Sequence, residues 1–305
     1  MKIIKINEND SGQRVDKFLS KILTGMPKSL LYKQLRKKRV KRNKKALAAQ
    51  DVLSCGDELY LYINDEFFGE AKEITATGEG LLVVYEDENI LVCEKPAGQP
   101  SHGGEDSLLS QIQGYLYAKG VYDPKAENSF APALSNRLDR NTRGLCLAAK
   151  NAAAQKKLNE KIKNHEVTKR YRCVLCGEIE QKSGRLRHYL VSDETENRVR
   201  VAKKESAGAK EAILEYRVLA AKNGKSLLEV TLLTGRKHQI RVQFSHVGHP
   251  LLGDTKYGAP RDKDFRYQAL CAYSLTFDFK GDNGVLENLK GKTVSIAENV
   301  FEDVL

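Results

Sequence analysis

A carboxylate lies between two arginines in the segment Arg137-Leu138-Asp139-Arg140, shortly before an apolar run that begins at Leu145. Opposite charges nearby favour the ionised form of a carboxyl group. An ionised carboxylate that faces a cleft can act as a nucleophile or as a base. The alternative is a structural ion pair at the start of a strand, and the residue pattern alone ranks this alternative first.

A second segment, residues 234–241, reads Thr-Gly-Arg-Lys-His-Gln-Ile-Arg. Its Thr-Gly pair can turn the chain so that Arg236 projects a planar guanidinium, which can bind a carboxylate through two parallel hydrogen bonds. Contact with phosphate and simple solvation at the surface are the other roles open to Arg236. The segment favours a reactive carboxylate at Asp139 over a structural ion pair, because it supplies a cation that can orient a carboxylate.

Basic residues concentrate near the beginning of the chain. The 305 residues include 51 Lys and Arg against 40 Asp and Glu, a net charge of +11, which suggests a polyanionic partner. Residues 17–50 contain twelve basic residues and no acidic one. Apolar residues recur through this run at spacings that suit two amphipathic helices, so we expect a folded module rather than a disordered tail. Nucleic-acid binding is favoured over a merely solvated face.

The patterning divides the chain into two folded parts. Residues 1–65 form the basic module, and residues 66–80, which lack periodicity and contain three glycines, are expected to be a linker. Residues 81–305 hold many short apolar runs without regularly alternating helices. We therefore expect an α+β fold with a mixed, largely antiparallel sheet rather than a doubly wound one. Asn151 can cap a helix over residues 152–164.

Several function classes are disfavoured. No apolar run exceeds about six residues, whereas a membrane-spanning helix needs ~20, and the first residues lack the pattern of a secretory signal. Six cysteines without a regular ladder favour a reduced, cytoplasmic protein over a disulfide scaffold. We therefore expect neither membrane attachment nor secretion.

Two groups of potential metal ligands are incomplete. Cys173 and Cys176 have the spacing of half a zinc site, but no second pair follows, and in a strand their sulfurs point to opposite faces. We expect them in the core. His238, His246 and His249 lack a further ligand to complete a tetrahedral shell and are expected on the surface. The sequence predicts no metal.

Taken together, these segments closely resemble the RluA-type pseudouridine synthases, in the branch that modifies large-subunit ribosomal RNA, over nearly the whole chain. The central motif is the segment around Asp139, and the third motif is residues 234–241. The order and spacing of the motifs carry the resemblance. The other matching residues are Lys95-Pro96-Ala97-Gly98, Lys169, Tyr171 and Gly253-Asp254.

The first 65 residues resemble a small RNA-binding domain named after a small-subunit ribosomal protein. The matching runs are residues 14–19, 33–41 and 56–59. The resemblance implies a small basic α/β domain whose two helices present cations to the RNA backbone, followed by the catalytic domain. It implies RNA contacts for Arg14, Lys17, Lys33, Arg36, Lys37 and Arg39.

The resemblance implies an isomerase, an intramolecular transferase that converts uridine in RNA to pseudouridine. It implies that Asp139 is the catalytic carboxylate, that Tyr171 stacks on the target base, and that Arg236 pairs with Asp139. Arg137 and Arg140 are expected to contact RNA once the uridine is flipped out. Because the reaction includes no redox step and no phosphoryl transfer, no cofactor is expected.

Three alternatives stay open. The basic module favours ribosomal RNA or pre-ribosomal particles as the partner, a transfer-RNA substrate would use the same chemistry, and a ribosome-assembly factor would bind RNA without turnover. Asp139 can attack the anomeric carbon or remove a neighbouring ribose proton, and the sequence does not choose. No obligate protein partner is expected.

Overall fold

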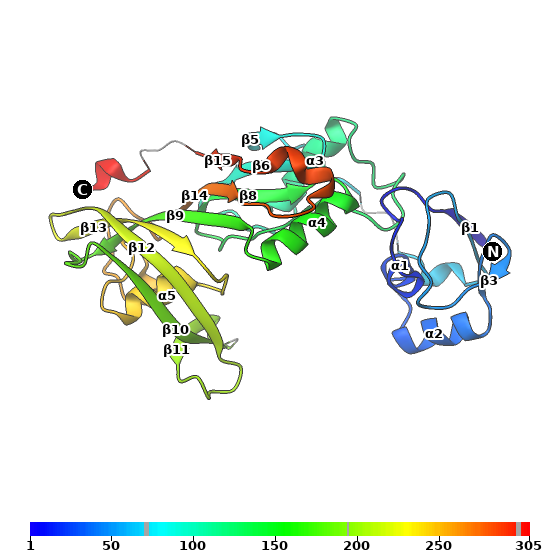
Figure 1. The fold of residues 1–305 in the computed structure, drawn as a ribbon, viewed down its shortest axis with the longest axis horizontal. Coiled ribbons are helices and arrows are strands. Elements are labelled where there is room, and N and C mark those ends of the chain that lie inside the picture. Colours follow the sequence, from blue (N-terminus) through cyan, green and yellow to red (C-terminus); the bar gives the residue numbers. More distant parts are fainter. Residues whose placement is uncertain (70–72, 194, 297–299) are drawn as a thin grey trace.

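The computed structural model describes residues 1–69, 73–193, 195–296 and 300–305. The chain forms a small domain with a four-stranded sheet and a large domain built on an eleven-stranded sheet. The small domain lies beside the end of the large domain that carries α3 and α4, whereas β10–β12 project from the opposite end (Figure 1). No described helix has the length and apolarity that crossing a membrane requires.

The small domain packs two helices against one face of its sheet. The four strands pair in the order β1-β4-β2-β3, with every pairing antiparallel. Its elements are β1 (Lys2–Lys5), α1 (Val15–Ile22), α2 (Lys28–Arg36), β2 (Val40–Arg42), β3 (Lys45–Ala46), β4 (Glu58–Leu61) and the 3-10 helix η1 (Asp65–Phe67).

The spacing of apolar residues along α1 explains this packing. Phe18 and Leu19 are completely buried and join Leu59 and Leu61 of β4 in one apolar core. Lys17, on the opposite side of α1, is exposed. The apolar face therefore holds the helix on the sheet while the cationic face meets solvent.

The large domain contains a mixed and largely antiparallel sheet, as predicted. Its central strands follow the order β11-β10-β12-β13-β9-β14-β8-β6-β5, with β15 beside β14 and β7 beside β8. The first half comprises β5 (Leu82–Glu86), β6 (Ile90–Lys95), α3 (Leu108–Ala118), β7 (Ala133–Leu134), β8 (Arg143–Ala149), α4 (Ala152–Lys163) and β9 (Val167–Cys176). The second half comprises β10 (Ser183–Asp193), β11 (Arg198–Ala202), β12 (Lys210–Lys222), β13 (Lys225–Leu232), α5 (Gln239–His246), η2 (Thr255–Tyr257), β14 (Leu270–Phe277), η3 (Gly284–Leu289), β15 (Thr293–Ser295) and η4 (Glu302–Val304).

Both faces of the central strands are covered. Along β6, Leu91 and Cys93 join the apolar cluster that contains α3 and α5, whereas Ile90 and Val92 join the cluster that contains α4 and η3. Alternate residues of a strand point to opposite faces. A strand buried on both sides therefore reads as a continuous apolar run.

The predicted helix over residues 152–164 is confirmed as α4. The side-chain oxygen of Asn151 accepts a hydrogen bond of 2.8 Å from the backbone N–H of Ala154. This bond satisfies one of the amide groups that a helix leaves unpaired at its beginning.

The strands β8 and β14 form a parallel contact close to the segment that carries Asp139. Gly144 pairs with Ala272, and its φ is +129°. A Cβ at Gly144 would lie 2.3 Å from the carbonyl oxygen of Ala272. Only glycine allows this approach.

Polar contacts join the two domains. Asp10 is completely buried, and its carboxylate accepts hydrogen bonds of 2.6 Å from Asn128 Nδ2 and from Ser129 Oγ. Asn9 Oδ1 accepts a further bond of 2.9 Å from the backbone N–H of Ala152. The loop after β1 thereby fixes the small domain against the large one.

The expected linker, residues 66–80, includes residues 70–72, which lie outside the described part of the chain. Before that gap, Phe67 and Phe68 pack against the core of the small domain. After it, Ile74 packs against the core of the large domain. The segment therefore contacts both domains.

Replacing Asp10 by Ala should lower the free energy of unfolding by about 1–3 kcal/mol, because it removes a buried acceptor of hydrogen bonds from the half-buried side chains of Asn128 and Ser129. Urea unfolding monitored by circular dichroism measures the change. Asp264→Ala, at an exposed acid, is the control and should stay within ~0.5 kcal/mol of the wild type. An unchanged unfolding midpoint for Asp10→Ala would contradict this account of the interface.

Candidate active site

Asp139 occupies a turn that is fixed on both sides. Its backbone carbonyl accepts a hydrogen bond of 3.0 Å from the N–H of Thr142, directly before β8. On the other side, Ser101 Oγ donates to the carbonyl of Leu138 at 2.7 Å. The Asp139 side chain is 26% exposed, so its carboxylate is open to solvent while its backbone is held.

A buried lysine ties a second loop to this turn. Lys95 is completely buried, and its Nζ donates to the carbonyls of Pro96, Gln99 and Arg140 at 2.8–2.9 Å. Burial lowers the pKa of Lys95 to about 8. The Lys-Pro-Ala-Gly segment therefore forms one structural unit with the turn of Asp139.

Arg241, in the first turn of α5, is the cation that contacts Asp139. Its Nη1 donates to Asp139 Oδ2 at 3.0 Å, and its Nε and Nη2 donate to the two carboxylate oxygens of Asp254 at 2.7 and 2.8 Å. Arg241 and Asp254 are both buried. Burial alone would lower the pKa of Arg241, but the hydrogen bonds and charge of Asp254, followed by those of Asp139, hold it above its ordinary value.

The predicted pairing of Arg236 with Asp139 is wrong. Arg236 is exposed, and its Nε donates to the backbone carbonyl of Glu211 at 2.8 Å. The reason is local: Gln239 Oε1 accepts a hydrogen bond from the backbone N–H of Arg236, and the resulting turn directs residue 236 towards β12. Helix α5 then presents Arg241 to Asp139. Arg236 and Asp139 nevertheless line one cavity.

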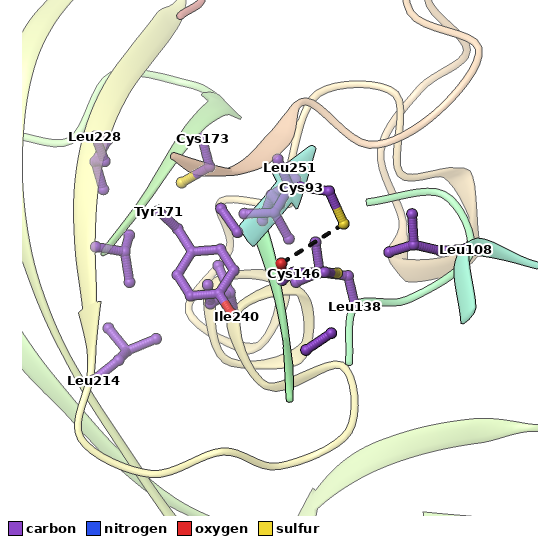
Figure 2. Packing of buried hydrophobic residues seen from close by; sticks show 14 of the residues in the cluster. Cys93, Leu108, Leu138, Cys146, Tyr171, Cys173, Leu214, Leu228, Ile240 and Leu251 are labelled. Carbon is purple, nitrogen blue, oxygen red and sulfur yellow. Dashed lines mark hydrogen bonds between the residues drawn. The ribbon is translucent and has the colours of Figure 1, made fainter. Parts of the chain in front are cut away.

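Tyr171, on β9, combines a core position with access to the site. Its ring lies among Leu214, Leu228, Cys173 and Ile240 (Figure 2), and it lines the same cavity as Asp139. Burial, and to a smaller extent the charge of Asp139, raises the pKa of the Tyr171 hydroxyl well above its ordinary value. The tyrosine therefore offers the cavity a neutral aromatic ring.

His238 is a site residue that the sequence did not reveal. The prediction of a surface histidine is wrong, because its side chain is only 9% exposed and its Nε2 lies 3.7 Å from Asp139 Oδ2. Its Nδ1 lies 2.6 Å from the hydroxyl oxygen of Tyr257. The other two histidines of that group lie elsewhere: His246 is exposed and His249 is half-buried.

A cavity of about 830 Å³ opens over Asp139. Its charged side chains are cationic apart from Asp139, which suits a polyanionic ligand. The cationic residues that line it include Arg137, Arg140, Lys169, Arg236, Lys237 and Lys256.

The predicted RNA-binding residues of the small domain are exposed along α1, α2 and the turn after α2. Arg14 differs from the others, because its guanidinium binds the carboxylate of Asp16 through two hydrogen bonds of 3.1 and 2.7 Å. RNA contact by these residues stays a prediction. The remaining members are Lys17, Lys33, Arg36, Lys37 and Arg39.

Within the described residues, no three His, Cys, Asp or Glu side chains gather in a way that could hold a metal ion. Cys173 belongs to the apolar core, as predicted from its place on a strand, and Cys176 is half-buried at the end of β9. Both are free thiols.

Comparison with known proteins identifies the family. Residues 89–246 match the family model described as RNA pseudouridylate synthase. The chain belongs to this family. It is therefore an RNA pseudouridine synthase, an isomerase, and the resemblance to the RluA-type enzymes is confirmed.

Two curated relatives span most of the chain. The ribosomal large subunit pseudouridine synthase C of Escherichia coli (strain K12) is 30% identical over 88% of this chain and 82% of its own length. The uncharacterized RNA pseudouridine synthase YlyB of Bacillus subtilis (strain 168) is 30% identical over 90% of this chain and 89% of its own length.

A solved structure shares the fold. Human RNA pseudouridylate synthase domain containing 4 superimposes with a TM-score of 0.57 at 24% identity, covering 71% of this chain and 88% of that chain. The similarity at this level concerns the architecture of the domain.

Replacing Asp254 by Ala should lower the free energy of unfolding by about 3–5 kcal/mol, because it leaves the buried guanidinium of Arg241 without its main counter-charge. Equilibrium urea unfolding measures the loss. The control is Asp282→Ala, which breaks an ion pair with Lys157 at an acid that is 85% exposed and should cost less than ~1 kcal/mol. Equal losses for the two variants would contradict the buried pair.

Proposed function

We propose that the protein converts uridine to pseudouridine in large-subunit ribosomal RNA, with Asp139 as its catalytic carboxylate. One observation carries the proposal: Asp139 is partly exposed in a cationic cavity, with Arg241 on one of its oxygens and Tyr171 lining the same cavity. A carboxylate, an orienting cation and a neutral aromatic ring are the groups that this isomerisation uses.

The reaction breaks the bond between the ribose anomeric carbon and N1 of uracil, turns the base and joins it again through C5. Asp139 attacks the anomeric carbon or removes the proton of the neighbouring ribose carbon, and both routes require a carboxylate with a free oxygen. Arg241 donates to Asp139 Oδ2. Its fixed position keeps the carboxylate oriented through either route.

The target uridine must leave its base stack, which costs roughly a few kcal/mol. Cationic contacts distributed over the cavity and the small domain supply this free energy, because each phosphate contact adds affinity. The ring of Tyr171 provides a stacking surface for the detached uracil. A tyrosine hydroxyl is protonated at neutral pH even at its ordinary pKa, so the ring carries no charge that would repel the anionic RNA.

Two features support ribosomal RNA as the substrate. The exposed cations of α1 and α2 form a second contact surface outside the cavity, which suits a large folded RNA. The relative from Escherichia coli is named as a synthase of the large ribosomal subunit. We therefore assign this chain to the same substrate class.

The Asp139→Asn variant should form at least about 10³-fold less pseudouridine than the wild type. Its affinity for RNA should change less than about threefold, because the amide keeps the size of the side chain and an acceptor for Arg241. Mass spectrometry of large-subunit ribosomal RNA transcripts measures the product, and filter binding measures the affinity.

Asp123→Asn, at an exposed acid after α3, is the matched control and should turn over like the wild type. Full turnover by Asp139→Asn would remove Asp139 from the catalytic role. A protein that modifies transfer RNA transcripts but not ribosomal RNA would overturn the substrate assignment.

Replacing Lys33, Arg36 and Lys37 together by Ala should weaken RNA binding and reduce the salt dependence of affinity. For each phosphate that the variant no longer neutralises, the slope of log K against log salt should fall by about 0.7–0.9. The rate in a single turnover at saturating RNA should stay unchanged, because these residues lie in the small domain. Binding titrations at several salt concentrations measure the slope.

The control for this variant is a triple replacement of exposed lysines in the large domain, Lys163, Lys263 and Lys290. It changes the net charge by the same amount. An equal fall in slope for the two variants would show that total charge, rather than the α2 surface, determines the affinity.

A further inference from the structure

His238 adopts a strained backbone at the beginning of α5. Its φ of +53° and ψ of +21° lie in the left-handed region, which residues other than glycine rarely adopt. Such strain persists where the surrounding structure holds a residue in place, and it clusters at functional sites. The side chain is almost completely buried against Asp139 and Tyr257.

The contact between Tyr257 and His238 bears on which ring nitrogen of His238 carries the hydrogen. The hydroxyl oxygen of Tyr257 accepts a bond of 3.0 Å from the backbone N–H of Val199. The same oxygen lies 2.6 Å from His238 Nδ1, a contact in which either the tyrosine O–H or an imidazole N–H can be the donor. Because a neutral imidazole has one N–H, donation by the Tyr257 hydroxyl places the hydrogen of His238 on Nε2, the nitrogen that faces Asp139.

Burial keeps this imidazole neutral. Burial, with smaller contributions from the positive charges of Arg241, Lys256 and Lys237, outweighs the charge of Asp139 and lowers the pKa of His238 to about 4. At neutral pH, well above this value, the ring is uncharged and carries one N–H.

The two oxygens of the Asp139 carboxylate have different surroundings. Arg241 Nη1 donates to Oδ2 at 3.0 Å, and His238 Nε2 faces the same oxygen at 3.7 Å. Catalytic hydrogen bonds are commonly long before the substrate binds and shorten in the complex. Among the described residues, no side chain hydrogen-bonds to or forms an ion pair with Oδ1 of Asp139.

We propose that His238 is a positioning residue whose Nε2–H, fixed by Tyr257, holds Oδ2 of Asp139 together with Arg241, so that Oδ1 is the oxygen that reacts. This inference rests on the proposed catalytic role of Asp139. In direct attack, Oδ1 bonds to the anomeric carbon while the electron pair of the glycosidic bond leaves with uracil. In the alternative route, Oδ1 takes the proton of the neighbouring ribose carbon as the same bond breaks.

The variant His238→Asn tests the Nε2–H. Asparagine tolerates the left-handed backbone and can accept the Tyr257 hydrogen bond, but it is too short to reach Asp139. We expect a single-turnover rate about 10²-fold lower with unchanged affinity for RNA. His238→Gln, whose amide reaches further, should have a single-turnover rate at least about tenfold higher than that of His238→Asn.

His165→Asn is the matched control, because His165 also has a left-handed backbone, with φ of +58°, but is exposed. It should turn over at the wild-type rate. A wild-type rate for His238→Asn would overturn the positioning role, since the donor to Asp139 would then be dispensable.

The tautomer itself can be read from long-range nitrogen–proton correlation spectra of protein labelled with ¹⁵N-histidine. We expect His238, identified by its loss in His238→Asn, to carry its hydrogen on Nε2 at neutral pH. Tyr257→Phe should shift the hydrogen towards Nδ1 and lower the rate. Hydrogen on Nδ1 in the wild type would overturn the proposal.

Failure of the proposed function has a different signature. In that case Asp139→Asn retains turnover, or the wild type makes no pseudouridine, while His238 still carries its hydrogen on Nε2. The spectroscopic measurement and the Asp139→Asn assay therefore separate the two conclusions.

Discussion

The buried ion pair between Arg241 and Asp254 is the interaction on which the site depends. A guanidinium without a partner in this position would be strongly unfavourable, and Asp254 binds it through two parallel hydrogen bonds. This geometry leaves one nitrogen, Nη1, directed at Asp139. The guanidinium of Arg241 thus joins three segments: helix α5, the chain before η2 and the turn before β8. Its rigidity gives the Asp139 carboxylate a defined orientation, which a flexible lysine would not provide.

Much of this architecture was predictable from short-range patterns. Short apolar runs indicated the sheet of the large domain, and Asn151 marked the first turn of α4, because a helix cap is formed by neighbours in the sequence. The acid with adjacent arginines around Asp139 was equally typical of a structural ion pair, and only its place among the other motifs indicated a site. The order of such motifs along the chain indicated the family, which the match of residues 89–246 confirms.

Other features depend on contacts that no local pattern encodes. Arg236 and Arg241 lie in one motif, and only the turn fixed by Gln239 decides which of them meets Asp139. The role of His238 depends on Tyr257, nineteen residues further on. The domain interface consists of short polar loops that have no hydrophobic periodicity. In each case the deciding information is a specific hydrogen bond rather than a residue type.

The close approach of β8 to β14 has a consequence for how the protein matures during synthesis. Gly144 pairs with Ala272, so the strand that follows Asp139 acquires its neighbour only after more than a hundred further residues have been made. Arg241 and Asp254 also emerge long after Asp139. A nascent chain therefore displays the exposed cations of its small domain well before the residues that surround Asp139 have all been synthesised.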